Sequence, residues 1–172
     1  MLLKMMGTVL VIGGLGFYGV SRAGSSERRV GQLINLRLSL NFLEKEITCT
    51  HTPLSRALLK TAGFTDWPVS LLYKETAGNL NKKNLTAGEA WSQGLGKLSS
   101  RSDLKPVDLE LLRSAGPQLG MSDTLEQSKF LALIQEELAV QIERARREAD
   151  TARRIWTYAG FIAGAMIVLL VI

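Results

Sequence analysis

Residues 122–172 read SDTLEQSKFLALIQEELAVQIERARREADTARRIWTYAGFIAGAMIVLLVI. Apolar residues recur there at steps of three and four, which places them on one helical stripe: Leu131, Ile134, Leu138, Ile142, Ala145, Ala149, Ala152 and Trp156. Charged residues flank this stripe as far as Arg154. From Ile155 to Ile172 the Tyr158 phenol is the one ionisable side chain, and no proline separates the two halves. The stretch therefore predicts a single helix that faces water in its first half and lipid in its second.

A second apolar segment lies at the other end of the sequence, where residues 1–20 contain one charge, Lys4. About 20 helical residues are needed to cross a hydrocarbon core of about 30 Å. We therefore expect transmembrane helices at 1–21 and 155–172, with a helical domain at 22–154 between them.

A cleaved signal peptide is the alternative for the first segment, because Ser21-Arg22-Ala23 weakly imitates a cleavage site. The long apolar run and the arginines that follow it favour a retained anchor. If cleavage did occur, the middle domain would be exported and held by the C-terminal anchor alone.

Arginines next to both predicted spans indicate the orientation. They are Arg22, Arg28 and Arg29 after the first span, and Arg144, Arg146, Arg147, Arg153 and Arg154 before the second. Positive residues collect on the cytoplasmic side of a membrane, so both termini should lie across the membrane from a cytoplasmic domain. The single cysteine, Cys49, agrees with a reducing compartment. The net charge of +5 fits attraction to anionic lipid headgroups, and no nucleic-acid-binding module accompanies it.

The middle domain has the pattern of six helices and no strand. The first should run from about Glu27 to Thr48, after a flexible joint at Gly24-Ser25-Ser26. Its apolar seam is Leu33, Leu36, Leu40, Leu43 and Ile47. Helix starts are predicted at Thr52-Pro53, Asp66-Trp67-Pro68, the capping box Thr86-Ala87-Gly88-Glu89, Pro106 and Ser122-Asp123. In the first of these, Thr52 is the expected N-cap and Pro53 the first helical residue. The fold class is all-α, a compact six-helix bundle.

Residues with catalytic chemistry are few in this sequence. His51 and Cys49 are the one possible acid–base and nucleophile pair, and residues two apart near a helix end seldom face each other. A membrane-bound hydrolase that uses them is kept as an alternative. No nucleotide motif or set of metal ligands is present, so we expect no enzyme activity, cofactor or metal.

Two groups of residues suggest contacts between macromolecules. The carboxylates Glu44, Glu46, Glu136 and Glu137 form a possible acidic patch for a basic partner, although charged helix faces are usually just solvated. Gly160 and Gly164 form a GxxxG pair, which favours close packing of the second span on the first or on another copy.

Several motifs together resemble one known family. They are Leu43-Glu44-Lys45-Glu46-Ile47 leading to His51-Thr52-Pro53-Leu54, then Glu89-Ala90-Trp91, and Leu119-Gly120-Met121-Ser122-Asp123 before the final charged helix. In this order they resemble stage III sporulation protein AB of endospore-forming Firmicutes, over nearly the whole chain. Met121 departs from the polar residue associated with that turn, which leaves the turn's role open.

The resemblance implies a component of the channel complex between mother cell and forespore. The soluble part would be similar to the cytoplasmic domains of inner-membrane platform proteins in type II secretion and type IV pilus machines. It would lie in the mother-cell cytoplasm and contact a stage III sporulation AA-type ATPase and other membrane subunits of the channel. The interaction residues carried over are Glu44, Glu46, His51, Pro53 and Leu54.

Overall fold

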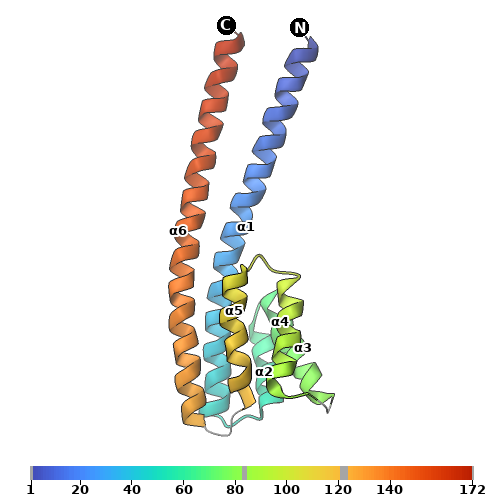
Figure 1. Ribbon diagram of the computed structural model, residues 1–172, viewed down its shortest axis with the longest axis vertical. Helices are drawn as coiled ribbons and strands as arrows, with labels where there is room; N and C mark the ends of the chain where they lie inside the picture. Colours follow the sequence, from blue (N-terminus) through green and yellow to red (C-terminus); the bar gives the residue numbers. More distant parts are fainter. Residues whose placement is uncertain (1, 83–84, 121–123, 172) are drawn as a thin grey trace. The chain divides into compact units, whose positions relative to one another are not determined.

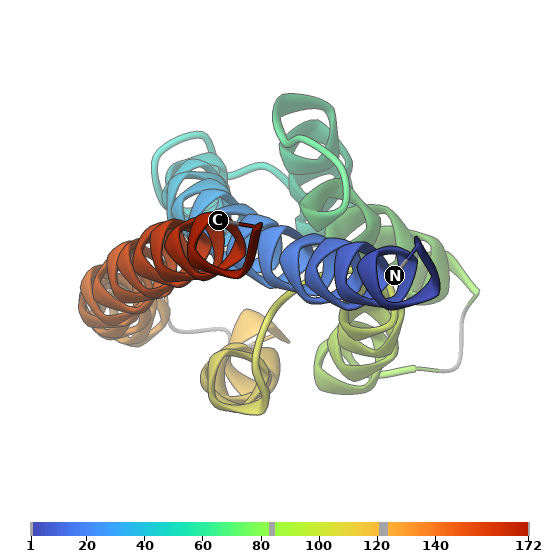
Figure 2. The same cartoon turned by 90° about the horizontal axis from the view of Figure 1, so that it is seen from above.

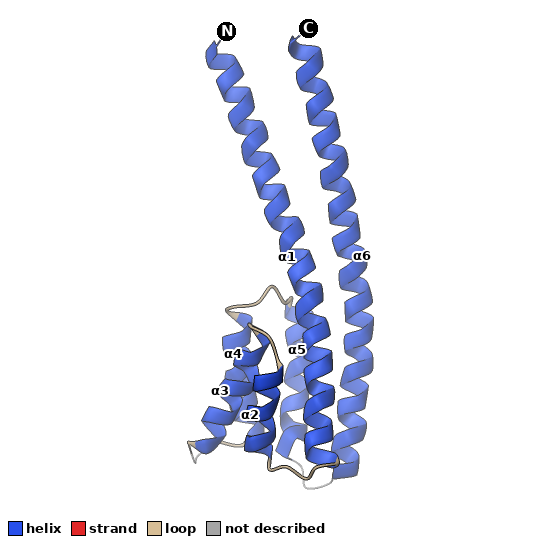
Figure 3. Ribbon diagram, turned by 180° about the vertical axis from the view of Figure 1, so that it is seen from behind, coloured by secondary structure: helices blue, strands red, loops and turns tan. Residues whose placement is uncertain are grey.

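The structure, a computed structural model, describes the backbone of residues 2–82, 85–120 and 124–171. Side-chain environments are described for 24–82, 85–120 and 125–155, and for four residues further on: Tyr158, Ala159, Ile162 and Met166. Every regular element in these ranges is helical, which confirms the all-α class (Figure 3). The predicted caps at Ser122 and Asp123 lie outside the described residues.

The described residues form six α-helices and one short 3-10 helix (Figure 1). Their bounds are α1 Leu2–Thr48, α2 Leu54–Phe64, α3 Val69–Asn81, α4 Ala87–Ser99, α5 Pro106–Ala115, η1 Gly116–Gly120 and α6 Thr124–Val171.

The chain divides into two compact units. Arg29–Glu143 forms the helical bundle, and Met1–Arg28 with Arg144–Ile172 forms the other unit. Helices α1 and α6 each supply residues to both units without a break. Among the residues whose side-chain environments are described, no helical stretch combines the length and the apolarity required for a membrane span.

The predicted joint at Gly24-Ser25-Ser26 is wrong, because α1 runs through these residues as a helix. Glycine in a helix interior lowers stability by about 1 kcal/mol relative to alanine, and serine by less. That amount is too small to interrupt a helix that continues for several turns on both sides.

The bundle core is built from the apolar stripes of the two long helices. On α1, the seam residues Leu33, Leu36, Leu40 and Leu43 are fully buried, and Ile47 is half-buried. On α6, the stripe from Leu131 to Ala145 is buried as its spacing predicts: Leu131, Ile134, Leu138, Ile142 and Ala145. The three- and four-residue periodicity therefore identified the inner faces of both helices.

The short helices α2 to α5 follow one another around the bundle in chain order, as the view from above shows (Figure 2). Two large polar aromatics lie in their core with hydrogen-bond partners. The Tyr73 hydroxyl is 2.7 Å from Ser39 Oγ, and Trp91 Nε1 donates to the Leu112 carbonyl at 2.7 Å. Burial raises the pKa of Tyr73, so this phenol stays neutral and cross-links α3 to α1.

The predicted capping box at the start of α4 is confirmed. Glu89 N donates to Thr86 Oγ1 at 3.3 Å, and Thr86 N donates to Glu89 Oε2 at 2.8 Å. These bonds favour the ionised carboxylate, so they lower the pKa of Glu89, the backbone bond most.

Helices α3 and α4 approach each other most closely at Gly94. A Cβ atom there would lie 2.5 Å from Thr76 Oγ1 and 2.7 Å from the Leu72 carbonyl oxygen. Because one of these neighbours is backbone, no larger side chain fits without displacing α3 from α4. The segment Gly94-Leu95-Gly96-Lys97 is therefore part of a helix–helix contact.

Candidate functional site

The corner between α1 and α2 brings together most of the residues expected to make contacts. Helix α2 runs antiparallel to α1, since Lys60 pairs with Glu46 and, one turn later, Phe64 stacks on Phe42 with ring centroids 4.9 Å apart. The loop 49–53 joins the two helices. Its geometry determines which side chains at this end of the bundle are presented to solvent.

Glu46 organises this corner. Its Oε2 atom accepts from Lys60 Nζ at 2.7 Å and from Thr52 Oγ1 at 2.8 Å. Lys60 and then Thr52 lower the pKa of the Glu46 carboxyl. The carboxylate therefore connects the end of α1, the loop and the second turn of α2.

His51 has a left-handed backbone with φ of 51°, the one described non-glycine residue with positive φ. This conformation reverses the chain so that Thr52 N donates to the Glu46 carbonyl at 2.9 Å. Non-glycine residues seldom adopt this region, although His, like Asn and Asp, occurs there more often than other residue types. A strained, exposed residue held by surrounding hydrogen bonds is a candidate functional position.

The predicted N-cap at Thr52 is wrong. Helix α2 begins at Leu54 with Pro53 in the cap position, and no side chain caps its first turn. The Thr52 hydroxyl donates to Glu46 instead. Pro53 is exposed and Leu54 is half-buried, so His51 and Pro53 are the most exposed of the predicted interaction residues at this corner.

Glu44 has a different environment from the one expected of a contact residue. Its Oε1 accepts from Ser128 Oγ and its Oε2 from Gln135 Nε2, both at 2.7 Å. Gln135 also accepts from Asn41 Nδ2 at 3.0 Å. The Glu44 carboxylate thus links α1 to α6 inside the bundle.

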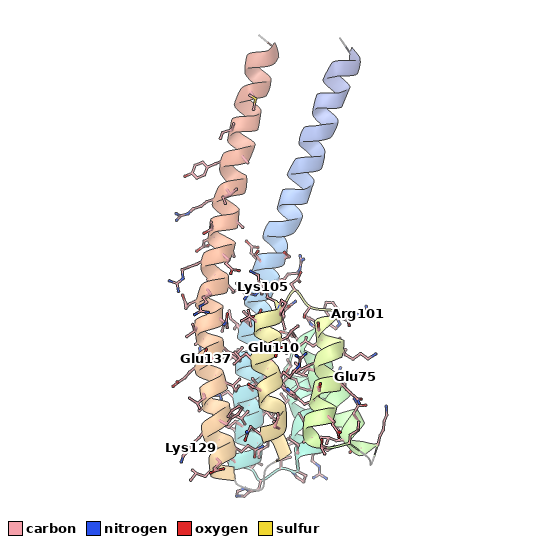
Figure 4. All side chains as sticks on the ribbon, viewed as in Figure 1. Glu75, Arg101, Lys105, Glu110, Lys129 and Glu137 are labelled. Atoms are coloured by element: carbon pink, nitrogen blue, oxygen red, sulfur yellow. The ribbon has the colours of Figure 1, made fainter. Side chains whose placement is uncertain are left out.

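The four carboxylates proposed as one acidic patch are therefore in different environments. Glu44 and Glu46 are held by neighbouring side chains, whereas Glu136 and Glu137 are exposed on α6. Figure 4 shows Glu137 pointing away from the bundle. Only the α6 pair is presented as an open acidic surface.

Cys49 and His51 are both exposed, and no hydrogen bond joins them among the described residues. Cys49 Sγ lies 3.6 Å from Thr48 Oγ1. The described residues also contain no group of three or more His, Cys, Asp or Glu side chains arranged to hold a metal ion. Cys49 and His51 are therefore not arranged as a nucleophile and its base.

The arginines proposed as topology signals are not equivalent. Arg28, Arg147, Arg153 and Arg154 are exposed, whereas Arg29 is 4% exposed. Arg29 Nε donates to Asp108 Oδ2 at 2.7 Å and its Nη2 donates to Oδ1 at 2.9 Å. The side chain of Arg22 and the surroundings of Gly160 and Gly164 lie outside the described part of the chain.

The Arg29–Asp108 pair and its neighbour, Gln32 with Asp103, were not predicted. Asp103 N donates to Gln32 Oε1 at 2.9 Å, and Gln32 Nε2 donates to Asp103 Oδ2 at 3.5 Å. Asp108 also accepts from Lys105 N at 2.9 Å. Asp108, two places after Pro106, was a usable signal for a capped helix start. The sequence holds no signal for the pairing of Asp108 with Arg29, which lies 79 residues earlier.

These features define an all-helical bundle protein with two long helices, α1 and α6, and an exposed corner between α1 and α2. The family model described as stage III sporulation protein AB matches residues 4–172. The chain belongs to that family.

Two relatives agree with this assignment. Stage III sporulation protein AB of Bacillus subtilis (strain 168) is 31% identical over 169 residues, which cover 98% of this chain and 99% of that protein. A solved structure of stage III sporulation protein AB is similar with a TM-score of 0.68 and 33% identity, covering 72% of this chain and 98% of that one. The family name refers to a stage of sporulation and to no chemical reaction.

Proposed function

We propose that this protein is a membrane platform of the sporulation channel complex between mother cell and forespore. It holds a helical bundle in the mother-cell cytoplasm between transmembrane helices at 1–21 and 155–172. The observation that carries the proposal is that α1 and α6 continue unbroken from the bundle toward the two apolar segments. Family membership supports the role in sporulation.

The charged residues near the proposed spans support the orientation. Arg28 precedes the bundle, and Arg147, Arg153 and Arg154 follow it, all with exposed side chains. Exposed cations close to a span attract anionic headgroups by about 1 kcal/mol each. Arg29 is a weaker topology signal, because its charge is paired with Asp108 inside the bundle.

The partners proposed for the bundle are the stage III sporulation AA-type ATPase and other membrane subunits of the channel. The contact with the ATPase is assigned to the α1–α2 corner, through His51 and Pro53. Glu44 and Glu46 act indirectly, because they hold α6 and α2 in place around that corner. A corner fixed by hydrogen bonds loses little conformational entropy on binding.

A binding measurement with matched variants tests this contact. The full-length protein in detergent is titrated with the purified ATPase, and His51→Gly and Pro53→Ala are expected to weaken binding about tenfold each, as for the minority of interface residues that carry most of the binding energy. His51→Gly should also raise thermal stability, because glycine adopts positive φ without strain. Lys82→Ala, an exposed position at the end of α3, is the control.

Three outcomes contradict the assignment. If both corner variants bind like the wild type, the corner is not the contact. Equal weakening by Lys82→Ala removes the claim of specificity. If the wild type does not bind the ATPase at all, the scaffold contact itself is wrong.

A further inference from the structure

Arg29 is the first buried side chain of α1 within the described residues 24–48. The compact bundle also begins at this residue. Residues 24–28, one turn earlier, are exposed or half-buried. Within the bundle, Arg29 is therefore the first residue of α1 with a buried side chain.

At this position α1 is held by polar bonds to the α4–α5 loop and to the start of α5. Arg29 makes a two-bond pair with Asp108, whose side chain is completely buried, and Gln32 exchanges two hydrogen bonds with Asp103. Asp103 lies in the α4–α5 loop and Asp108 in the first turn of α5. Arg101 and Lys105, at the two ends of this loop, are exposed (Figure 4).

Two properties distinguish this arrangement from an apolar contact. A guanidinium that meets a carboxylate through two parallel bonds fixes direction as well as distance, so α1 cannot rotate or slide at Arg29 without breaking both bonds. A partly broken pair leaves a charge buried without its counterion, which is strongly unfavourable. Residues 29–36 of α1 and residues 103–109 of the α4–α5 region are therefore expected to unfold locally in one event.

We infer that Arg29, Gln32, Asp103 and Asp108 form a clamp that couples α1 to the α4–α5 loop. Tilting or pulling of α1 is transmitted through the clamp to residues 101–108 of the bundle. The coupling to a membrane span rests on the proposed function, whereas the clamp itself rests on the bundle alone.

Hydrogen exchange on the full-length protein in lipid nanodiscs tests the clamp. Gln32→Leu removes the bonds between Gln32 and Asp103 and leaves the buried Arg29–Asp108 pair intact. Asp108→Asn removes the negative charge of that pair with little change in the shape of the side chain. Both variants are expected to speed exchange at residues 29–36 and at 103–109 by a similar factor, about tenfold or more, because both segments enter one local opening. Ser39→Ala is the control. Ser39 lies on α1 outside the clamp, and the variant removes its hydrogen bond to Tyr73 of α3.

The result that overturns the inference is faster exchange at 103–109 with unchanged exchange at 29–36, in either variant. The same exchange changes in Ser39→Ala as in the clamp variants would also overturn it, since general destabilisation would then account for them. If Asp108→Asn does not fold, Gln32→Leu alone decides between these outcomes.

A second readout separates the clamp from the proposed function. The gene for this protein is replaced, in the spore-forming host, by one that encodes the Gln32→Leu or the Ser39→Ala variant. Heat-resistant spores are then counted at a growth temperature where the two variant proteins are equally stable. The clamp predicts a clearly lower count for Gln32→Leu, and equal counts contradict its role in coupling. Failure of the two-span topology would leave the exchange result unchanged.

Discussion

At Gly94 the contact between α3 and α4 depends on the absence of a single carbon atom. The Cβ position is 2.5 Å from Thr76 Oγ1 and 2.7 Å from the Leu72 carbonyl oxygen. Thr76 cannot easily move away, because it is buried and its hydroxyl donates to that same carbonyl at 2.7 Å. Any substitution must therefore separate the two helices.

Gly94→Ala should lower the free energy of unfolding by about 1–3 kcal/mol, as overpacked cores do. Gly96→Ala is the matched control on the same helix, because nothing lies within 4 Å of its Cβ position. It should be neutral or stabilising by up to about 1 kcal/mol from helix propensity. Thermal unfolding of the full-length protein in detergent measures both, and equal melting temperatures would contradict the close contact at Gly94.

The Glu46 carboxylate gives the corner a dependence on pH. Its bonds to Lys60 and Thr52 hold its pKa below the ordinary value. A carboxyl with a lowered folded-state pKa stabilises the protein above its unfolded pKa of about 4.3. This contribution is lost as the pH falls through the folded-state pKa.

Glu46→Gln should therefore lower the melting temperature at pH 7 and have a smaller effect at pH 3.5. The effect should also shrink in 1 M salt, because the Lys60 ammonium is well exposed. Melting curves of the wild type and the variant at both pH values measure this difference. A difference that is the same at both pH values would show that the charge of Glu46 has no part in it.

At the scale of elements, the predictions that succeeded were those with a local cause. The apolar stripes of α1 and α6, the capping box of α4 and the start of α5 at Pro106 all follow from spacing and cap chemistry within a few residues. The N-cap at Thr52 failed because its hydroxyl is turned toward the Glu46 carboxylate, six residues earlier, to which it donates, and Pro53 takes the cap position. The joint at Gly24 failed because local propensity is weak against a long helix.

The interaction residues show where sequence reasoning stops. Glu44 and Glu46 look alike in the sequence, yet the structure assigns one to α6 and the other to Lys60 and Thr52. The left-handed backbone of His51 and the Arg29–Asp108 pair depend on how distant segments meet. No spacing rule contains that information, because the pairing is fixed by tertiary packing.

The continuity of α6 leads to a prediction about coupling. The helix belongs to the bundle up to Glu143 and to the other unit from Arg144 onward. If sporulation requires the bundle and the proposed second span to move together, this helix must stay unbroken. Inserting Gly-Pro-Gly-Gly after Ala152 should then reduce heat-resistant spores and leave the protein in the membrane fraction.

The matched control is an insertion of Ala-Glu-Ala-Lys at the same place. Both insertions have the length of about one helical turn. Only Gly-Pro-Gly-Gly interrupts the helix, since a proline in a helix interior destabilises it by about 3 kcal/mol. Spore counts and membrane fractionation compare the two strains. Equal counts would show that continuity of α6 is not needed.

At the scale of the whole molecule, the bundle is proposed to lie in the cytoplasm between two membrane spans. Cys49 provides a native probe of this claim, because it is the single cysteine of the chain and is exposed at the α1–α2 corner. A maleimide reagent that cannot cross membranes therefore reports on which side the bundle lies. The comparison protein carries Cys49→Ser with Ile172→Cys, which moves the probe to the proposed outer side.

The measurement is the labelling of these two proteins in intact and in permeabilised protoplasts. We predict that Cys49 is labelled only after permeabilisation and that the cysteine at position 172 is labelled in intact protoplasts. Labelling of Cys49 in intact protoplasts would place the bundle outside the cell and overturn the proposed orientation. Equal protection of both probes would contradict the two-span topology.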